Sequence, residues 1–171
     1  MGFQEIAKNR HSIRAYLPKE IEEEKLTQIL EAARQAPSAG NLQAYKIFVV
    51  KESQTKQQIA AAANDQDFLG QAAVILIFCQ DPYQSAKKYR KRGEELFSLQ
   101  DATIACAYAQ IAASDLGLGT CWVGAFDEEK VREIVHISQT LRPVALLPVG
   151  YPAETPPPHD RRPLSELVVK R

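Results

Sequence analysis

A long apolar segment, residues 99–116, constrains the fold of this chain more than any other feature. It is too extended for a strand and predicts a helix buried at the centre of the molecule, which Gly117 is expected to end. Two shorter apolar runs, residues 47–50 and 73–79, have the length of strands. The second shows no polar alternation, which predicts a strand buried on both faces. These runs together predict a sheet packed against a central helix.

Further elements alternate along the chain. Residues 22–35 carry apolar side chains at helical spacing behind three glutamates that complement the helix dipole. We also expect a helix over residues 53–63, a helix that Asp127 caps and that runs to His136, and strands over 120–126 and 142–150. No repeat, low-complexity tract or domain boundary interrupts the chain. Residues 1–171 therefore read as one α+β domain, a central sheet wrapped by helices.

Charge and cysteine content exclude several classes of function. The 171 residues include 21 basic and 21 acidic ones, so no overall charge attracts nucleic acid or an anionic membrane. The longest apolar run, residues 72–79, is too short to cross a bilayer, and the polar N-terminal segment lacks the apolar core of a secretion signal. We therefore expect a cytoplasmic protein. Cys79, Cys106 and Cys121 lack the spacing of a zinc site or a redox dithiol and are predicted to be buried, reduced thiols.

Two polar clusters flank the first predicted helix. The first cluster, residues 10–14, offers two arginines and a hydroxyl, which suit a phosphate and a polyhydroxyl chain. The second cluster, residues 37–43, offers exposed backbone, amide side chains and little bulk, as a flat ring against a loop requires. The alternatives are surface arginines at a helix end and an ordinary turn. Because no glycine-rich nucleotide-binding turn occurs, any phosphate must be held by side chains, and the two clusters together suggest a flavin.

The last twenty residues differ in character from the rest. Pro152 and the prolines at 156–158 make the segment stiff and extended, and residues 164–169 are too apolar to stay in solvent. We expect this tail to dock. A rigid arm of this length could reach a neighbouring subunit, which hints at a dimer with exchanged arms.

In their order along the chain these motifs resemble the nitroreductase-like flavoproteins, which bind FMN between the subunits of a homodimer. The resemblance spans nearly the whole sequence and rests on residues 10–14, 36–43, Asp101, 117–124, 147–152 and 161–164. It implies an α+β, nitroreductase-like fold with a central mixed, mostly antiparallel sheet flanked by helices. It also implies that the C-terminal arm is exchanged in a homodimer.

The resemblance also assigns roles to the polar residues. Arg10 and Arg161 would neutralise the FMN phosphate with help from Ser12, and either Arg161 or its neighbour could be the one that does so. Arg14 would lie near the pyrimidine edge of the ring, where a guanidinium stabilises the negative charge left by reduction. The predicted cofactor-binding residues are Arg10, His11, Ser12, Arg14, Pro37, Ser38, Ala39, Asn41, Gln43, Trp122, Val123, Gly124, Arg161 and Arg162.

Three residues depart from the pattern of the family or of some of its members. Ala44 and Tyr45 stand where the family usually has proline and tryptophan. Val123 stands where some relatives place a hydroxyl near the flavin N5, and without that hydroxyl we expect two-electron hydride chemistry. A specialised deiodinase or flavin-cleaving activity is disfavoured by the short region before Gln71.

The function implied is an FMN-dependent oxidoreductase. NADH or NADPH would give a hydride to the flavin N5, and an electron-poor acceptor such as a nitroaromatic or quinone would take it at the same site, with ping-pong kinetics. No metal site, nucleophile or general base is needed. The alternative is a flavin-binding sensor or carrier that turns nothing over. The basic run at residues 87–92 is either a solvated helix face or shapes access to the site.

Overall fold

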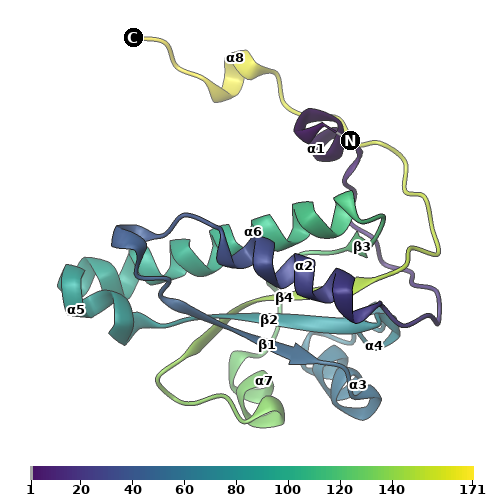
Figure 1. The fold of residues 1–171 in the computed structure, drawn as a ribbon, viewed down its shortest axis with the longest axis horizontal. Coiled ribbons are helices and arrows are strands. Elements are labelled where there is room, and N and C mark those ends of the chain that lie inside the picture. Colours follow the sequence, from purple (N-terminus) through teal and green to yellow (C-terminus); the bar gives the residue numbers. More distant parts are fainter. Residues whose placement is uncertain (1) are drawn as a thin grey trace.

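The computed structural model describes residues 2–171 and has a four-stranded antiparallel sheet with the strand order β1-β2-β4-β3 (Figure 1). The strands are β1 (Tyr45–Val50), β2 (Val74–Gln80), β3 (Gly119–Thr120) and β4 (Arg142–Gly150). All three strand ladders are antiparallel, and the isolated bridge between Ser12 and Thr120 is parallel. The predicted mostly antiparallel sheet is confirmed.

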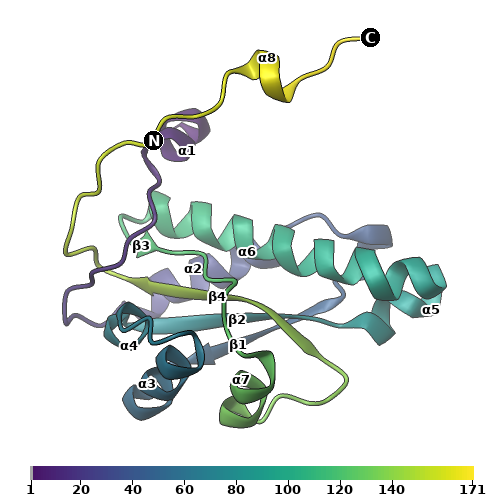
Figure 2. The ribbon, with the colours of Figure 1, turned by 180° about the vertical axis from the view of Figure 1, so that it is seen from behind.

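Helices cover both faces of this sheet. They are α1 (Phe3–Asn9), α2 (Glu23–Arg34), α3 (Ser53–Ala62), α4 (Phe68–Gln71), α5 (Pro82–Arg92), α6 (Ser98–Asp115), α7 (Glu128–Val135) and α8 (Leu164–Leu167). A 3-10 turn, η1 (Ala39–Asn41), and a π-helical turn, η2 (Gly93–Phe97), complete the elements. Helices α2 and α6 lie on one face, and α3, α4 and α7 lie on the other (Figures 1 and 2).

Strand β2 explains why both faces are covered. Every one of its residues is buried. Val74, Leu76 and Phe78 point into the core beneath α2 and α6, whereas the alternate residues Ile75 and Ile77 point into the core beneath α3 and α7. Because side chains alternate across a strand, an unbroken apolar run needs an apolar layer on each side. Each fully buried large side chain contributes about 1.5–3 kcal/mol.

Helix α6 is the longest helix and packs against α2 and the sheet. Its 18 residues make it about 27 Å long at 1.5 Å per residue. Ala105, Cys106 and Ala109 form its buried face. Apolar or aromatic residues also occupy the opposite side, where Tyr108 is 44% exposed. The helix is therefore apolar nearly all round although only one side is covered within the chain.

The two ends of the chain lie on one side of the body, where α1 contacts α6 and buries Ile6. Figures 1 and 2 show α1 and α8 on the same side of the molecule, beyond the layer of α6. Every residue of the segment 157–171 is exposed, and Leu164 and Val169 expose 76% and 81% of their surface. The tail was predicted to dock, and it does not dock on its own chain.

The structure confirms most predicted elements and corrects one. The predicted strand over residues 120–126 is wrong, since β3 ends at Thr120 and only Val123 returns to pair with β4. The chain then turns toward α3, where the backbone N–H of Asp127 donates a hydrogen bond to the Ala62 carbonyl at 2.8 Å. Helices α1, α4 and α5 were not expected from the sequence. Within residues 2–171, no helix is both long and apolar enough to cross a membrane.

Candidate functional site

The first cluster lies along the end of the sheet beside β3. The backbone N–H of Ile13 donates to the Thr120 carbonyl at 2.9 Å, and Ser12 forms the parallel bridge with Thr120. In this extended segment Ile13 is buried in the core and Arg14 is exposed. Because side chains alternate in direction along an extended segment, the buried Ile13 anchors it and Arg14 faces solvent.

The arginines of this cluster have no acidic partner. In the part of the chain that the structure describes, neither Arg10 nor Arg14 forms a salt bridge. The carboxylate of Glu154 instead accepts a hydrogen bond from the backbone N–H of Arg14. Burial raises the pKa of the Cys121 thiol, and the charges of Arg14 and Arg10 and a hydrogen bond with Ser12 partly oppose that rise. These side chains thus converge on one place and present unpaired positive charge there.

The residues after Cys121 differ in what they can offer a ligand. Val123 pairs with Leu146 through both of its backbone groups, at 2.9 and 3.0 Å, and its side chain is buried. Trp122 exposes 36% of its surface and Gly124 is also exposed. Trp122 and Gly124 are therefore the exposed residues of this segment, and the contact predicted for Val123 stays a prediction.

The second cluster is held by a buried carboxylate. Asp101, which is 2% exposed in the first turn of α6, accepts hydrogen bonds from the backbone N–H groups of Ala39 at 2.9 Å and Ala44 at 3.2 Å. Ser38 accepts one from the backbone N–H of Gln43 at 3.0 Å. Because buried backbone donors need acceptors, the carboxylate fixes the loop onto the helix.

The turn itself exposes backbone. Gly40 and Asn41 have φ values of 58° and 56°, in the left-handed region, and both are exposed together with Pro37. Gly40 and Asn41 are residue types that tolerate this conformation. The structure therefore confirms the predicted turn with exposed backbone and little side-chain bulk. Its contact with a flat ring stays a prediction.

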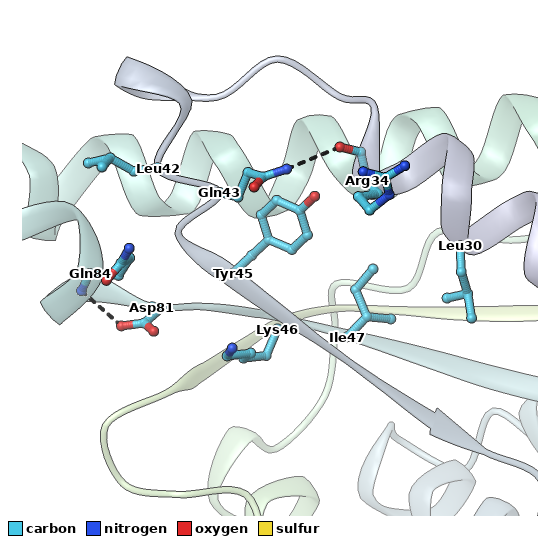
Figure 3. Close-up of a pocket in the computed structure, with 9 residues that line it drawn as sticks. All are labelled: Leu30, Arg34, Leu42, Gln43, Tyr45, Lys46, Ile47, Asp81 and Gln84. Atoms are coloured by element: carbon cyan, nitrogen blue, oxygen red, sulfur yellow. Dashed lines mark hydrogen bonds between the residues drawn. The ribbon is translucent and has the colours of Figure 1, made fainter.

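Gln43 borders a cavity of about 520 Å³ (Figure 3). Its side-chain amide donates to the Arg34 carbonyl at 3.3 Å, and the neighbouring Tyr45 hydroxyl donates to the Ala33 carbonyl at 3.0 Å. The cavity is lined by residues of α2, β1 and the start of α5, and by no residue of the first cluster. Its lining residues are Leu30, Arg34, Leu42, Gln43, Tyr45, Lys46, Ile47, Asp81 and Gln84.

The two clusters lie at opposite ends of α6. The second is tied to Asp101 near the start of the helix, and the first lies beside Thr120, shortly after its end at Asp115. From Asp101 to Asp115 the helix rises about 20 Å at 1.5 Å per residue. Within one chain, the two clusters therefore lie too far apart to form one site. We call each cluster a half-site.

The third predicted part of the site, Arg161 and Arg162 on the C-terminal arm, is exposed. Arg162 pairs with Glu166 at 3.0 Å, whereas Arg161 forms no salt bridge with any residue of 2–171. His11 and Ser12 are half-buried beside the first cluster. Of the two neighbouring arginines, Arg161 is the one with a guanidinium available to an anion.

The sequence alone placed Asp101 among the residues that carry the resemblance and did not predict what its side chain does. Its burial and its two backbone donors show that it positions the second cluster. A lone acidic residue in an apolar helix was the available signal, since such a residue is buried only when paired. The three cysteines are buried, as predicted. No cluster of metal-ligating side chains is found among residues 2–171.

Comparison with known proteins adds to this geometry. A family model described as the nitroreductase family matches residues 7–151. An FMN reductase (NADPH) of Bacillus subtilis is 29% identical over 85% of this chain, and this chain spans 64% of that protein's length. An NADH dehydrogenase of Thermus thermophilus is 31% identical, with 96% of this chain and 94% of the relative covered. The solved structure of Bacillus megaterium NfrA2 superposes with a TM-score of 0.91 at 27% identity, covering 99% of this chain and 74% of that one.

Proposed function

Because the chain belongs to the nitroreductase family, we propose that it is an FMN-dependent oxidoreductase that takes electrons from NADH or NADPH and works as a homodimer. Relatives named FMN reductase support the cofactor and the donor. The observation that carries the proposal is the unpaired positive charge of the first cluster, placed beside a half-exposed tryptophan and without any glycine-rich phosphate loop.

The side chains present fit FMN. Arg10, with the hydroxyl of Ser12 beside it, supplies charge and a hydrogen bond for a phosphate, and Arg161 adds a third unpaired guanidinium from the arm. Arg14 supplies positive charge for the pyrimidine edge of the ring. When bound, FMN supplies hydride transfer at N5 from the nicotinamide donor to an electron-poor acceptor such as a nitroaromatic or a quinone.

A second copy of the chain completes the proposed site. A two-fold axis across the exposed side of α6 would set two such helices antiparallel, because a symmetric dimer uses the same patch twice. The start of α6 in one copy, with residues 37–43, would then meet the end of α6 in the other, with residues 10–14. Ile104, Ala107, Tyr108 and Ile111 lie on the side of α6 that the chain leaves partly uncovered.

The C-terminal arm is proposed to cross to the partner. Leu164, Leu167 and Val169 are exposed by 76%, 56% and 81%, which is a large apolar surface for a tail that touches no core of its own. The outer edge of β1 is unpaired in the sheet order of the described residues and is the kind of edge that another chain can cover.

The proposed function is tested by an absorbance spectrum of the purified protein with FMN. Under argon, the flavin bands should bleach when NADH or NADPH is added and should return when menadione is supplied. A protein that takes up no FMN would refute the proposed cofactor. Bands that stay unbleached with both donors would favour the alternative, a flavin-binding sensor or carrier.

The dimer is tested separately by light scattering after gel filtration. Tyr108→Glu places a charge on the uncovered side of α6, where the aromatic ring is 44% exposed. We expect this variant to become a monomer and to lose FMN, since a desolvated, unpaired charge opposes association. Glu133→Gln, on the exposed surface of α7, is the control and should remain dimeric. A dimeric Tyr108→Glu protein with normal FMN content would refute this interface.

A further inference from the structure

Helix α5 lies directly against the turn of the second cluster. The backbone N–H of Asp81, at the start of α5, donates to the Ala44 carbonyl at 2.8 Å. A Cβ atom at Gly40 would lie 2.6 Å from the Tyr89 hydroxyl oxygen and 2.8 Å from the Lys88 Nζ. The tips of Lys88 and Tyr89 therefore rest on the one residue of the turn that has no side chain.

Most basic residues of α5 have no acidic partner. Within residues 2–171, Lys91 forms a salt bridge with Glu95 at 3.5 Å, and no other basic side chain of this helix does. Lys87 donates to the Gln84 side chain at 2.8 Å. The Lys88 ammonium lies 5.4 Å from the centre of the Tyr89 ring and is otherwise available. An ammonium of this kind is a point charge suited to a phosphate.

The backbone near the end of α5 departs from helical geometry. Arg90 has a φ of 51° and a ψ of −137°, a conformation that costs about 1–3 kcal/mol for a residue with a side chain. The π-helical turn η2 follows, in which a Cβ at Gly93 would lie 2.5 Å from the Ser85 carbonyl oxygen. Tyr89 packs edge-on against Phe97 with ring centres 5.0 Å apart. The ring contact of Tyr89 with Phe97 thus anchors the residue that follows Lys88.

We propose that Lys88 binds a phosphate group of the nicotinamide dinucleotide donor. The inference rests on the proposed function, in which residues 37–43 line the flavin. A donor whose nicotinamide stacks on that flavin carries its phosphates away from the ring and past the turn at Gly40. Lys88 is a cation without a salt-bridge partner among residues 2–171, and its Nζ lies beside Gly40 of this turn. It therefore sets donor affinity and leaves the chemistry to the flavin.

Steady-state kinetics of three variants test this assignment. Lys88→Gln removes the charge, Lys88→Arg keeps it, and Lys130→Gln removes a charge from α7, where Lys130 is 68% exposed. Menadione serves as an uncharged acceptor, and each donor is titrated. For Lys88→Gln we expect the KM for the donor to rise by about 10-fold, as the loss of a charge-assisted hydrogen bond implies, with kcat and the KM for menadione unchanged. Lys88→Arg should keep the KM for the donor close to that of the wild type.

The outcomes separate the possible phosphates. A rise for both donors assigns Lys88 to the pyrophosphate, and a rise for NADPH alone assigns it to the ribose 2′-phosphate. An unchanged donor KM, or an equal rise in Lys130→Gln, would overturn the proposal. So would a loss of FMN affinity in Lys88→Gln, because Lys88 would then serve the cofactor. Failure of the proposed function itself would appear in the wild-type protein, as an absence of FMN uptake or bleaching, and the donor site would fall with it.

Discussion

The two ends of α6 carry the two predicted half-sites, and they are built by different physical means. At the start of the helix, one buried carboxylate, that of Asp101, holds the loop of the second cluster through two backbone hydrogen bonds. At the other end, the first cluster is held by apolar packing. Ile13 is buried and lies so close to Gly119 that a Cβ there would be 2.8 Å from its Cγ1 atom. A polar anchor thus supports one half-site and close packing supports the other.

The comparison shows how each half-site can be lost. The loop over residues 37–43 contains no fully buried side chain, so its position depends on the carboxylate beneath it. The segment of the first cluster continues into Tyr16, which is buried and whose hydroxyl donates to the Ile13 carbonyl at 2.8 Å. Support for that segment is therefore distributed over several contacts. The start of α6 should be sensitive to one polar change, and the end should respond to changes in volume.

The largest effect is expected from Asp101→Ala. The backbone N–H groups of Ala39 and Ala44 would lose their acceptor, and we expect the free energy of unfolding to fall by about 2–4 kcal/mol. The affinity for FMN should fall at least about 10-fold, because the loop would no longer be fixed. Urea unfolding and FMN titration measure the two effects.

Asp127→Ala is the matched control for this change. Asp127 caps α7 by accepting from the backbone N–H groups of Glu129 and Lys130, both at 3.1 Å. Loss of this cap should cost about 1 kcal/mol of stability and leave FMN affinity unchanged. If Asp101→Ala behaved like the control in both measurements, the carboxylate would not be the anchor of the second cluster.

A smaller effect is expected from Gly119→Ala at the other end of the helix. The added methyl group would press on Ile13 at 2.8–3.0 Å and should cost about 1–3 kcal/mol of unfolding free energy. Gly70→Ala is the control, since a Cβ there would meet its nearest neighbour at an ordinary 3.5 Å. Thermal unfolding of both variants provides the comparison. Equal melting temperatures for the two would mean that the contact between Ile13 and Gly119 yields without strain.

The smallest effect concerns two thiols, Cys106 on the buried face of α6 and Cys121 beyond its end. Burial raises the pKa of both thiols, and at Cys121 the charge of Arg14 partly opposes the rise. In variants that each keep one of these cysteines, Cys121 should react with iodoacetamide at lower pH than Cys106. Arg14→Gln should raise the pKa of Cys121 further and leave Cys106 unchanged. An unchanged Cys121 profile in Arg14→Gln would place that guanidinium away from the thiol.

These pKa shifts also determine whether the free energy of unfolding rises or falls at alkaline pH. A thiol whose pKa is higher in the folded than in the unfolded chain favours folding fully below the unfolded pKa, about 8.5. That contribution is lost as the pH rises above this value. The free energy of unfolding should therefore be level near neutral pH and fall above about pH 9, by up to about 1.4 kcal/mol per pH unit for each such thiol.

Most of the layered architecture could be predicted from sequence because it depends on local periodicity. The unbroken apolar run of β2 and the long apolar segment of α6 each predict a buried element from their own residues, without knowledge of their neighbours in the fold. The strand expected over residues 120–126 failed because its length depends on how many residues pair with β4 before the chain turns toward α3. Pairing between distant segments leaves no local periodicity to detect.

The amino-acid sequence by itself determined the buried sheet, the central helix and the two sets of polar residues that indicate a flavin, because residue type and spacing carry that information. Tertiary structure decided that the clusters lie at opposite ends of α6, that Asp101 holds one of them, and that α5 brings Lys88 onto Gly40. These facts depend on which surfaces meet when helices pack on the sheet. Such contacts arise from the shape of the whole core, and no short stretch of residues specifies them.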